Sequence, residues 1–315
     1  MLLIISNQKD ATVDYLVPFL IKSAIPFLRF DTDSCLEKTT LSYEDGIALL
    51  EYDGTSYEPE VFDVIWYRRP ESLLSPGLSP EETFTIREWS EMIENYFALI
   101  PNKKWINHPM NNARASHKIL QLDIAKSLGI DVPDTLVTTS QERFKVFYEK
   151  HSGKVIAKPV FSGYVDRRGI GNDSIIYTNR VLESHLVKIH EIRTCPTLFQ
   201  EEISKGYDVR ITILDNFIVA VKLLSQNENE QGCDIRINNM QGVLYSTIAL
   251  PTDVRHGLML LMDYYSLRFA AIDMIVDRNE KWFFLEINPC GQWAWLDQEA
   301  GTYIAQFFID TFTQR

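Results

Sequence analysis

Oxygen-bearing side chains interrupt two apolar, strand-like segments late in the chain. Asp273 lies in AAIDMIVD, and Glu286 and Asn288 lie in FLEINP. Because Glu286 and Asn288 are two residues apart, a strand presents both on one face. Mg²⁺ prefers octahedral oxygen coordination, usually from one or two carboxylates completed by phosphate oxygens. A lone Asp here would more often be a polar residue at a sheet edge, but the three residues together predict a magnesium site.

Basic side chains recur within equally apolar segments. Lysine and arginine are costly inside apolar strands unless an opposite charge faces them, and an anionic ligand such as a nucleoside triphosphate provides that charge. The plainer interpretation is that each one snorkels to the surface or pairs with a nearby acid. That interpretation is favoured for Lys118 alone, but not for Lys158 or Arg210. The basic residues are Lys118, Lys158 in AKP, Arg210 in DVRI, Lys222 in AVKL and Arg236 in DIRIN.

A glycine-containing loop, SGYVDRRGIGND at 162–173, directly follows the segment of Lys158. The backbone N–H groups of such a loop can approach phosphate oxygens and close over them. Its spacing matches neither the P-loop nor the dinucleotide-binding fingerprint. The position beside Lys158 is therefore what makes the loop a candidate for phosphate binding, through Ser162, Gly163, Gly169 and Gly171.

The elements that must position these residues change character along the chain. The first hundred residues or so alternate short apolar runs with amphipathic segments, which predicts a small α/β unit. The turn-rich PNKKWINHP is followed by a helical pattern over 112–127, and KVIAKPVF reads as a buried strand.

Strand patterns dominate from Thr197 onward, beginning with TLFQEEI and ending with KWFFLEINP. They predict an antiparallel, sheet-rich region with one helix over 253–265 and an apolar tail of helical spacing over 293–312. We therefore expect three domains, at 1–108, 109–196 and 197–315.

Composition supports an ordinary folded protein of two or three domains. The chain has 315 residues, of which 45% are hydrophobic, and 31 basic against 43 acidic side chains give a net charge of −12. Nucleic acid is a poor partner for such a chain. No stretch of 18 apolar residues exists and the apolar start is too short for a signal peptide, so we expect no membrane association and a cytoplasmic location. The cysteines are widely separated, which predicts reduced thiols, at Cys35, Cys195, Cys233 and Cys290.

The order of these features resembles the ATP-grasp superfamily over nearly the whole chain. Along the sequence come Lys118, Lys158, the glycine loop, LFQEEI, DVRI, DIRIN, Asp273 and LEINP. The resemblance implies an α/β (α+β) ATP-grasp fold, with an N-terminal pre-ATP-grasp α/β domain, a small central lid domain and a C-terminal antiparallel-sheet domain. It also implies ATP and two Mg²⁺ ions as cofactors.

The resemblance further implies a role for each candidate residue. Lys118 and Lys158 hold the α- and β-phosphates, and the loop 162–171 covers the triphosphate. LFQEEI supplies the hinge that meets adenine, with Asp208 on the ribose side. The implied cofactor-binding set is Lys118, Lys158, Ser162, Gly163, Gly169, Gly171, Gln200, Glu201, Glu202, Ile203, Asp208 and Lys222; the catalytic set is Arg210, Arg236 and Asn238; the metal set is Asp273, Glu286 and Asn288.

Two further stretches, IWYRRPES at 65–72 and NPCGQWAWLD at 288–297, are similar to the microviridin-type peptide maturases, or graspetide synthetases. Such enzymes form side-chain ester or amide crosslinks in ribosomal peptides. Asp297 stands where Glu is expected, and Cys290 where Asn is commoner. For Trp293 and Trp295, packing of a helix against the sheet is favoured over contact with a substrate.

The leading interpretation is a ligase that phosphorylates Asp or Glu side chains of a precursor peptide and joins them to Thr or Ser hydroxyls or Lys amines, forming macrocycles. The implied partner is a ribosomal peptide with a leader and an acidic core containing Thr, Ser or Lys. An alternative is a glutathione synthetase-like ligase of small amino acids or of carboxylate and amine substrates, and a third is a nucleotide-binding regulator without catalysis. The oligomeric state stays open, a homodimer included.

Overall fold

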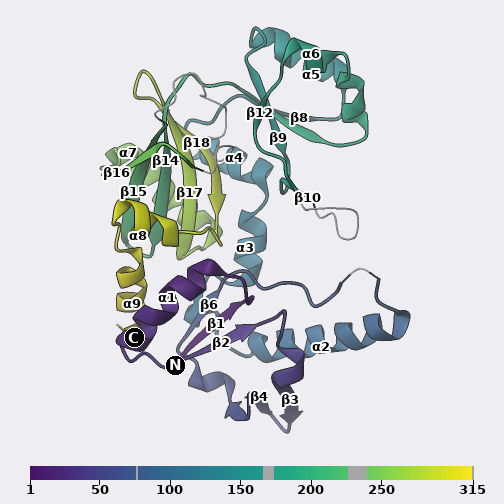
Figure 1. Cartoon of the computed structure of the whole chain (residues 1–315), viewed down its shortest axis with the longest axis vertical. Helices are drawn as coiled ribbons and strands as arrows, with labels where there is room; N and C mark the ends of the chain where they lie inside the picture. The colour runs from purple at the N-terminus through teal and green to yellow at the C-terminus, as the bar shows by residue number, and fades with distance from the viewer. Residues whose placement is uncertain (76, 166–173, 226–239, 314–315) are drawn as a thin grey trace.

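The structure is a computed structural model that describes residues 1–75, 77–165, 174–225 and 240–313. The protein is a mixed α/β protein whose described strands form five sheets. Figure 1 shows the sheet with the N-terminus at the bottom, a large antiparallel sheet above it, and a smaller sheet projecting to the upper right. None of the described helices has an apolar stretch long enough to cross a bilayer.

The N-terminal sheet is parallel and buried on both faces. One face packs against α1 (Ala11–Lys22), whose first turn is capped by Asp10, and the other against α2 (Pro80–Ala98). All five residues of β1 are buried, which is why LLIIS reads as a continuous apolar run. The strand order is β2 (Phe27–Asp31), β1 (Leu2–Ser6), β6 (Val64–Tyr67) and β7 (Trp105–Ile106).

An antiparallel meander, which the sequence patterns above did not single out, extends this region. Its strands are β3 (Thr39–Glu44), β4 (Ile47–Tyr52) and β5 (Thr55–Tyr57). Two Asp-Gly pairs form the turns, Asp45–Gly46 and Asp53–Gly54, each with positive φ at both residues. Asp-Gly between apolar runs is a strong hairpin signal, so this meander was detectable from the sequence.

The middle sheet is antiparallel and small. Its order is β12 (Asn179–Arg180), β9 (Val155–Pro159), β13 (Thr197–Glu201) and β8 (Thr135–Thr138), with the short hairpin β10 (Tyr164–Val165) and β11 (Ser174–Ile175) beside it. Its core forms against α5 (Gln141–Lys150), with α6 (Glu183–Leu186) nearby. β13 thus pairs within this sheet, although a boundary at residue 197 groups TLFQEEI with the later strands.

The helical pattern expected over 112–127 is two helices, α3 (Pro109–Ala115) and α4 (Lys118–Ser127). His117 adopts an extended backbone conformation between them and acts as the N-cap of α4. The break therefore makes Lys118 the first residue of a helix rather than a residue in the middle of one.

The C-terminal sheet is entirely antiparallel, as the strand patterns predicted. One face packs against α4 and α7 (Thr252–Tyr265), and the chain ends in α8 (Ala294–Ala300) and α9 (Ile304–Thr313). The order is β16 (Val243–Ile248), β15 (Phe217–Ser225), β14 (Lys205–Leu214), β17 (Phe269–Asp277) and β18 (Trp282–Asn288).

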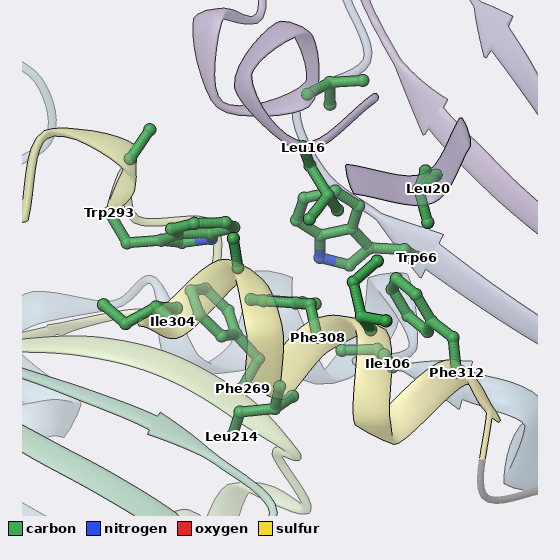
Figure 2. Packing of buried hydrophobic residues seen from close by; sticks show 14 of the residues in the cluster. Leu16, Leu20, Trp66, Ile106, Leu214, Phe269, Trp293, Ile304, Phe308 and Phe312 are labelled. Carbon is green, nitrogen blue, oxygen red and sulfur yellow. The ribbon is translucent and has the colours of Figure 1, made fainter. Parts of the chain in front are cut away.

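A single apolar cluster joins the N-terminal sheet to the C-terminal sheet. Figure 2 shows Phe308 of α9 between Trp66 of β6, Phe269 of β17 and Trp293. Trp293 is fully buried and stacks on Phe308, with ring centroids 5.0 Å apart. Its packing role, favoured from the sequence, is therefore confirmed.

Candidate active site

Three neighbouring strands place charged residues in one row. Register pairs Arg210 of β14 with Asp273 of β17, and Asp273 with Glu286 of β18. The Arg210 Nη1 donates to Asp273 Oδ1 at 2.8 Å. Asn288 lies two residues beyond Glu286 and pairs with Ala271. The structure thus brings together the three predicted metal ligands and the arginine predicted beside them.

Two predicted lysines add positive charge beside Glu286. The Nζ of Lys118 lies 3.4 Å from Glu286 Oε2 and donates to the Pro159 carbonyl at 3.4 Å. Burial by itself raises the pKa of Glu286, but the charges of Lys118, Lys158 and Arg210 outweigh it and lower that pKa below its usual value. Glu286 is therefore held as a carboxylate, and Lys118 pairs with an acid, as the plainer interpretation from the sequence expects, although that acid is one of the predicted metal ligands.

Lys222 is not brought to this row. It pairs with Val209, and side chains paired across an antiparallel ladder share a face, so Lys222 lies on the opposite side of the sheet from Arg210 and Asp273. Its ammonium lies 4.0 Å from the centre of the Tyr207 ring. The expectation that Lys222 joins the other basic residues therefore has no support in the geometry; the physical reason is the alternation of faces along β15.

A pocket of about 380 Å³ lies where the middle sheet meets the C-terminal sheet. Its apolar lining comes from both sides, with Ile156 on one and Ile275 and Leu285 on the other. The predicted residues that line it are Lys158, Gln200, Glu201, Glu202, Ile203 and Asp208.

Several lining residues were missed from the sequence. Lys154 and Ile156 precede Lys158 by four and two residues, and Ile275 follows Asp273 by two, so the strand period already pointed to these positions. Arg180 and Lys205 had no such signal. The lining residues without a sequence prediction are Pro133, Lys154, Ile156, Thr178, Arg180, Ser204, Lys205, Ile275 and Leu285.

The side chains of the hinge segment are held by other protein groups. Glu201 Oε1 accepts from the Asp134 N–H at 2.9 Å, and Arg180 Nε donates to Glu202 Oε1 at 2.5 Å. The predicted ribose-side acid, Asp208, forms an ion pair of 2.8 Å with Lys205. The side chains of Glu201 and Glu202 are thus anchored beside the pocket.

The glycine loop is described only at its start. A Cβ on Gly163 would lie 2.2 Å from the Ile176 carbonyl oxygen, so this position requires glycine. Ser162 Oγ accepts from the Tyr164 N–H at 3.1 Å. The remaining predicted residues, Gly169, Gly171, Arg236 and Asn238, lie outside the described residues.

The chemistry of the donor set fits Mg²⁺. Asp273, Glu286 and Asn288 offer two carboxylates and one amide oxygen on adjacent strands. Within the described ranges, no group of three or more His, Cys, Asp and Glu side chains is placed to hold a metal by itself. Mg²⁺ commonly uses one or two carboxylates and takes its other ligands from phosphate and water, which is what such a set requires.

A model of the RimK-like ATP-grasp domain matches residues 113–312. No curated protein matches the chain. Among solved structures, a RiPP-associated ATP-grasp ligase of Chryseobacterium gregarium, in complex with ADP and a leader and core peptide, is 27% identical with a TM-score of 0.85, over 99% of this chain and 96% of the other.

Macrocyclase MdnC of Microcystis aeruginosa, bound with its precursor peptide MdnA, is 25% identical with a TM-score of 0.84, over 100% of this chain and 99% of the other. D-alanyl-alanine synthetase A of Vibrio cholerae is similar in fold, with 13% identity and a TM-score of 0.62, over 99% and 97% of the two chains.

Proposed function

Since the chain belongs to the RimK-like ATP-grasp family and is an ATP-dependent, ADP-forming ligase, we propose that it crosslinks side chains of a ribosomal precursor peptide. The bonds formed are esters from Asp or Glu to Thr or Ser, or amides from Asp or Glu to Lys. Macrocycles result because both reacting groups belong to one peptide.

The proposed reaction proceeds in two steps. A peptide carboxylate attacks the γ-phosphorus of ATP, so that an acyl phosphate forms and ADP leaves. A hydroxyl or amine of the same peptide then attacks the acyl carbon, the carbon–oxygen bond to phosphate breaks, and the attacking group loses its proton. Each crosslink removes one water from the peptide.

In this proposal the protein positions charge and supplies no nucleophile. Asp273, Glu286 and Asn288 would hold Mg²⁺, which in such reactions neutralises negative charge on the phosphates. Lys158 lines the pocket and would contact the phosphates, while Arg210, which is paired with Asp273, would contact the transferred phosphoryl group. Preorganised positive charge of this kind stabilises the transition state more than the bound substrate.

One observation carries the proposal: the row Arg210–Asp273–Glu286 lies on the strands that also line the pocket, next to Lys158. A nucleotide bound in the pocket would therefore lie near these cations and the proposed metal ligands. The choice of a peptide substrate is supported by the similarity of the whole chain to ligases crystallised with precursor peptides.

Mass spectrometry of a peptide incubated with the protein, ATP and Mg²⁺ tests the proposal. The probe is a short acidic peptide that contains Thr, Ser or Lys, taken from a reading frame next to the gene of this chain where one with this composition is found, and the expected product has lost one water per crosslink. ATP turnover with small amino acids and an unmodified peptide would instead favour the glutathione synthetase-like alternative. Nucleotide binding without turnover on either substrate would favour the regulator.

A further inference from the structure

We propose that two buried side-chain amides, Gln121 and Asn107, are positioning residues that hold the backbone on either side of Asn288. We call the pair the amide clamp. The inference rests on the proposed function, because Asn288 and Glu286 are its proposed magnesium ligands. Both clamp residues lie in earlier parts of the chain, and both are 2% exposed.

Gln121 takes the place of a missing strand. β18 lies at the edge of its sheet, so the backbone groups of Ile287 that point away from β17 have no neighbouring strand. Gln121 Oε1 accepts from the Ile287 N–H at 3.1 Å, and Nε2 donates to the Ile287 carbonyl at 2.9 Å. Nε2 also donates to the Ala115 carbonyl at 2.5 Å. Ile287 lies between Glu286 and Asn288 in the sequence, so Gln121 holds the backbone segment from which both proposed magnesium ligands extend.

Asn107 holds the other side. Its Nδ2 donates to the Pro289 carbonyl at 3.0 Å and to the Phe269 carbonyl at 2.7 Å. Its Oδ1 accepts from the N–H groups of Arg268 at 2.8 Å and Phe269 at 3.0 Å. All four hydrogen-bonding positions of the amide are therefore used. The residue has a φ of 58°, in the left-handed region that asparagine tolerates better than most residues.

The amide clamp fixes the position of the backbone on either side of Asn288. All of these hydrogen bonds end on backbone groups, and those to Ile287 and Pro289 lie on either side of Asn288. The faces of a strand alternate with each residue, so a small rotation of this segment turns the oxygens of Glu286 and Asn288 away from a shared centre. Mg²⁺ requires near-ideal octahedral geometry, and outer partners that orient ligands commonly contribute 10- to 100-fold to metal affinity as an order of magnitude.

Helix α4 carries both a clamp residue and a charged residue of the proposed site. Gln121 lies one turn after Lys118 in α4, and Lys118 contacts Glu286. α4 therefore holds the β18 backbone through one side chain and the Glu286 carboxylate through another. A buried amide that only stabilised the fold would have no reason to change how metal affects nucleotide binding.

Calorimetric titration of ADP, once with Mg²⁺ and once with EDTA, separates these roles. The variants are Gln121→Glu, which keeps an acceptor but loses both donors, and Asn107→Gly, which keeps the backbone conformation but loses the amide. For each variant we expect the gain in ADP affinity from Mg²⁺ to fall by about 10-fold or more, with the affinity in EDTA unchanged. Gln121→Asn, which shortens the amide, and Asn107→Asp, which keeps the acceptor but loses both donors, serve as second variants.

Leu50→Ala is the matched control, because Leu50 is 1% exposed in the core of the N-terminal region, far along the chain from the clamp. It should lower the melting temperature and leave the effect of Mg²⁺ unchanged. A normal Mg²⁺ effect in the folded clamp variants would overturn the clamp alone, as would failure of all four to fold. No Mg²⁺-dependent ADP binding by the wild-type protein would overturn the proposed function itself.

Discussion

At the scale of single residues, Glu286 is the point where the charges of the site converge. Its pKa is lowered because Lys118, Lys158 and Arg210 outweigh the effect of burial. The carboxylate is thus ionised at neutral pH and offers oxygen to a cation. The same three cations would also contact the phosphates of a bound nucleotide. One set of positive charges would therefore stabilise both the Glu286 carboxylate and the nucleotide.

Replacing Glu286 by Gln should abolish crosslinking while the fold is retained. The change removes a charge and a proposed metal ligand but keeps the shape of the side chain, and Lys118 loses its carboxylate partner. We expect turnover to fall by about 100-fold or more, as losses of central electrostatic groups do. Crosslinking assayed over a range of Mg²⁺ concentrations, with circular dichroism for the fold, checks this. Wild-type turnover at limiting Mg²⁺ would contradict it.

Replacing Lys158 by Met should mainly weaken nucleotide binding. The substitution keeps a long unbranched side chain in the pocket and removes the point charge that would face the phosphates. Direct titration of a non-hydrolysable ATP analogue measures the effect, with about 10-fold weaker binding expected for one lost charge-assisted contact. Lys145→Met, at an exposed position of α5, is the matched control. Equal affinities in the two variants would remove Lys158 from the proposed site.

At the scale of elements, a buried ion pair connects the start of α1 to two other segments. Asp10 caps α1 and pairs with Arg68, which follows β6, and both side chains are fully buried. The Arg68 guanidinium also donates to the carbonyls of Cys290 and Gly291, each at 3.0 Å. The motifs WYRRP and NPCGQW, far apart in the sequence, therefore meet through one side chain.

The Asp10–Arg68 ion pair makes the stability of the protein depend on pH. Burial raises the pKa of Asp10, but Arg68 and hydrogen bonds from Ser6 and Thr12 outweigh it and lower the pKa below its ordinary value of 3.8. A carboxyl whose pKa is lower in the folded state stabilises the protein above its unfolded pKa, and this contribution is lost as the pH falls through the folded pKa.

Asp10→Asn should therefore be less stable at pH 7 by about 3 kcal/mol, the usual cost of breaking a buried pair. Its stability should also fall less steeply below about pH 4 than that of the wild type, since the titrating group is gone. Urea unfolding from pH 7 down to pH 3 measures both. Asp14→Asn on the same helix, where the carboxyl is 56% exposed, is the control expected to lose about 1 kcal/mol or less. Parallel pH profiles for wild type and Asp10→Asn would refute the assignment.

At the scale of the whole molecule, the last helix joins the two large sheets. Phe308 of α9 lies 4.8 Å from the Trp66 ring and 5.6 Å from the Phe269 ring, measured between centroids. Those aromatic residues belong to the N-terminal sheet and the C-terminal sheet respectively (Figure 2). Helix α9 therefore fixes how the region of α1 and β1 sits against the region of the proposed site.

Phe308→Ala should cost about 3–5 kcal/mol, because it leaves a cavity among aromatic rings that cannot close around it. Phe307→Ala, at a 37% exposed neighbour stacked on Phe217, should cost clearly less. Thermal unfolding of both variants beside the wild type makes the comparison. Similar losses for the two would show that burial at position 308 does not hold the sheets together.

Local patterns in the sequence determined much of this protein. Period-two alternation and turn residues depend only on neighbouring residues, so the strands of the last sheet and the helix near 253–265 are predicted correctly. The order of the chemical motifs is likewise a property of the chain, and it points to the ATP-grasp fold that the structure has.

Contacts between distant segments were decided only by the tertiary structure. β13 joins the middle sheet because its pairing with β8 and β9 is long-range, and no local pattern encodes it. Lys222 faces away from Arg210 because its register places it opposite Val209, and the apolar residues on both faces of β15 hide this alternation in the sequence. Gln121 and Asn107 look like ordinary polar residues in the sequence. They act as a clamp only because folding brings them to the backbone of residues 287 and 289. The hydrogen-bond partners of a side-chain amide are set by tertiary contacts, which the local sequence does not specify.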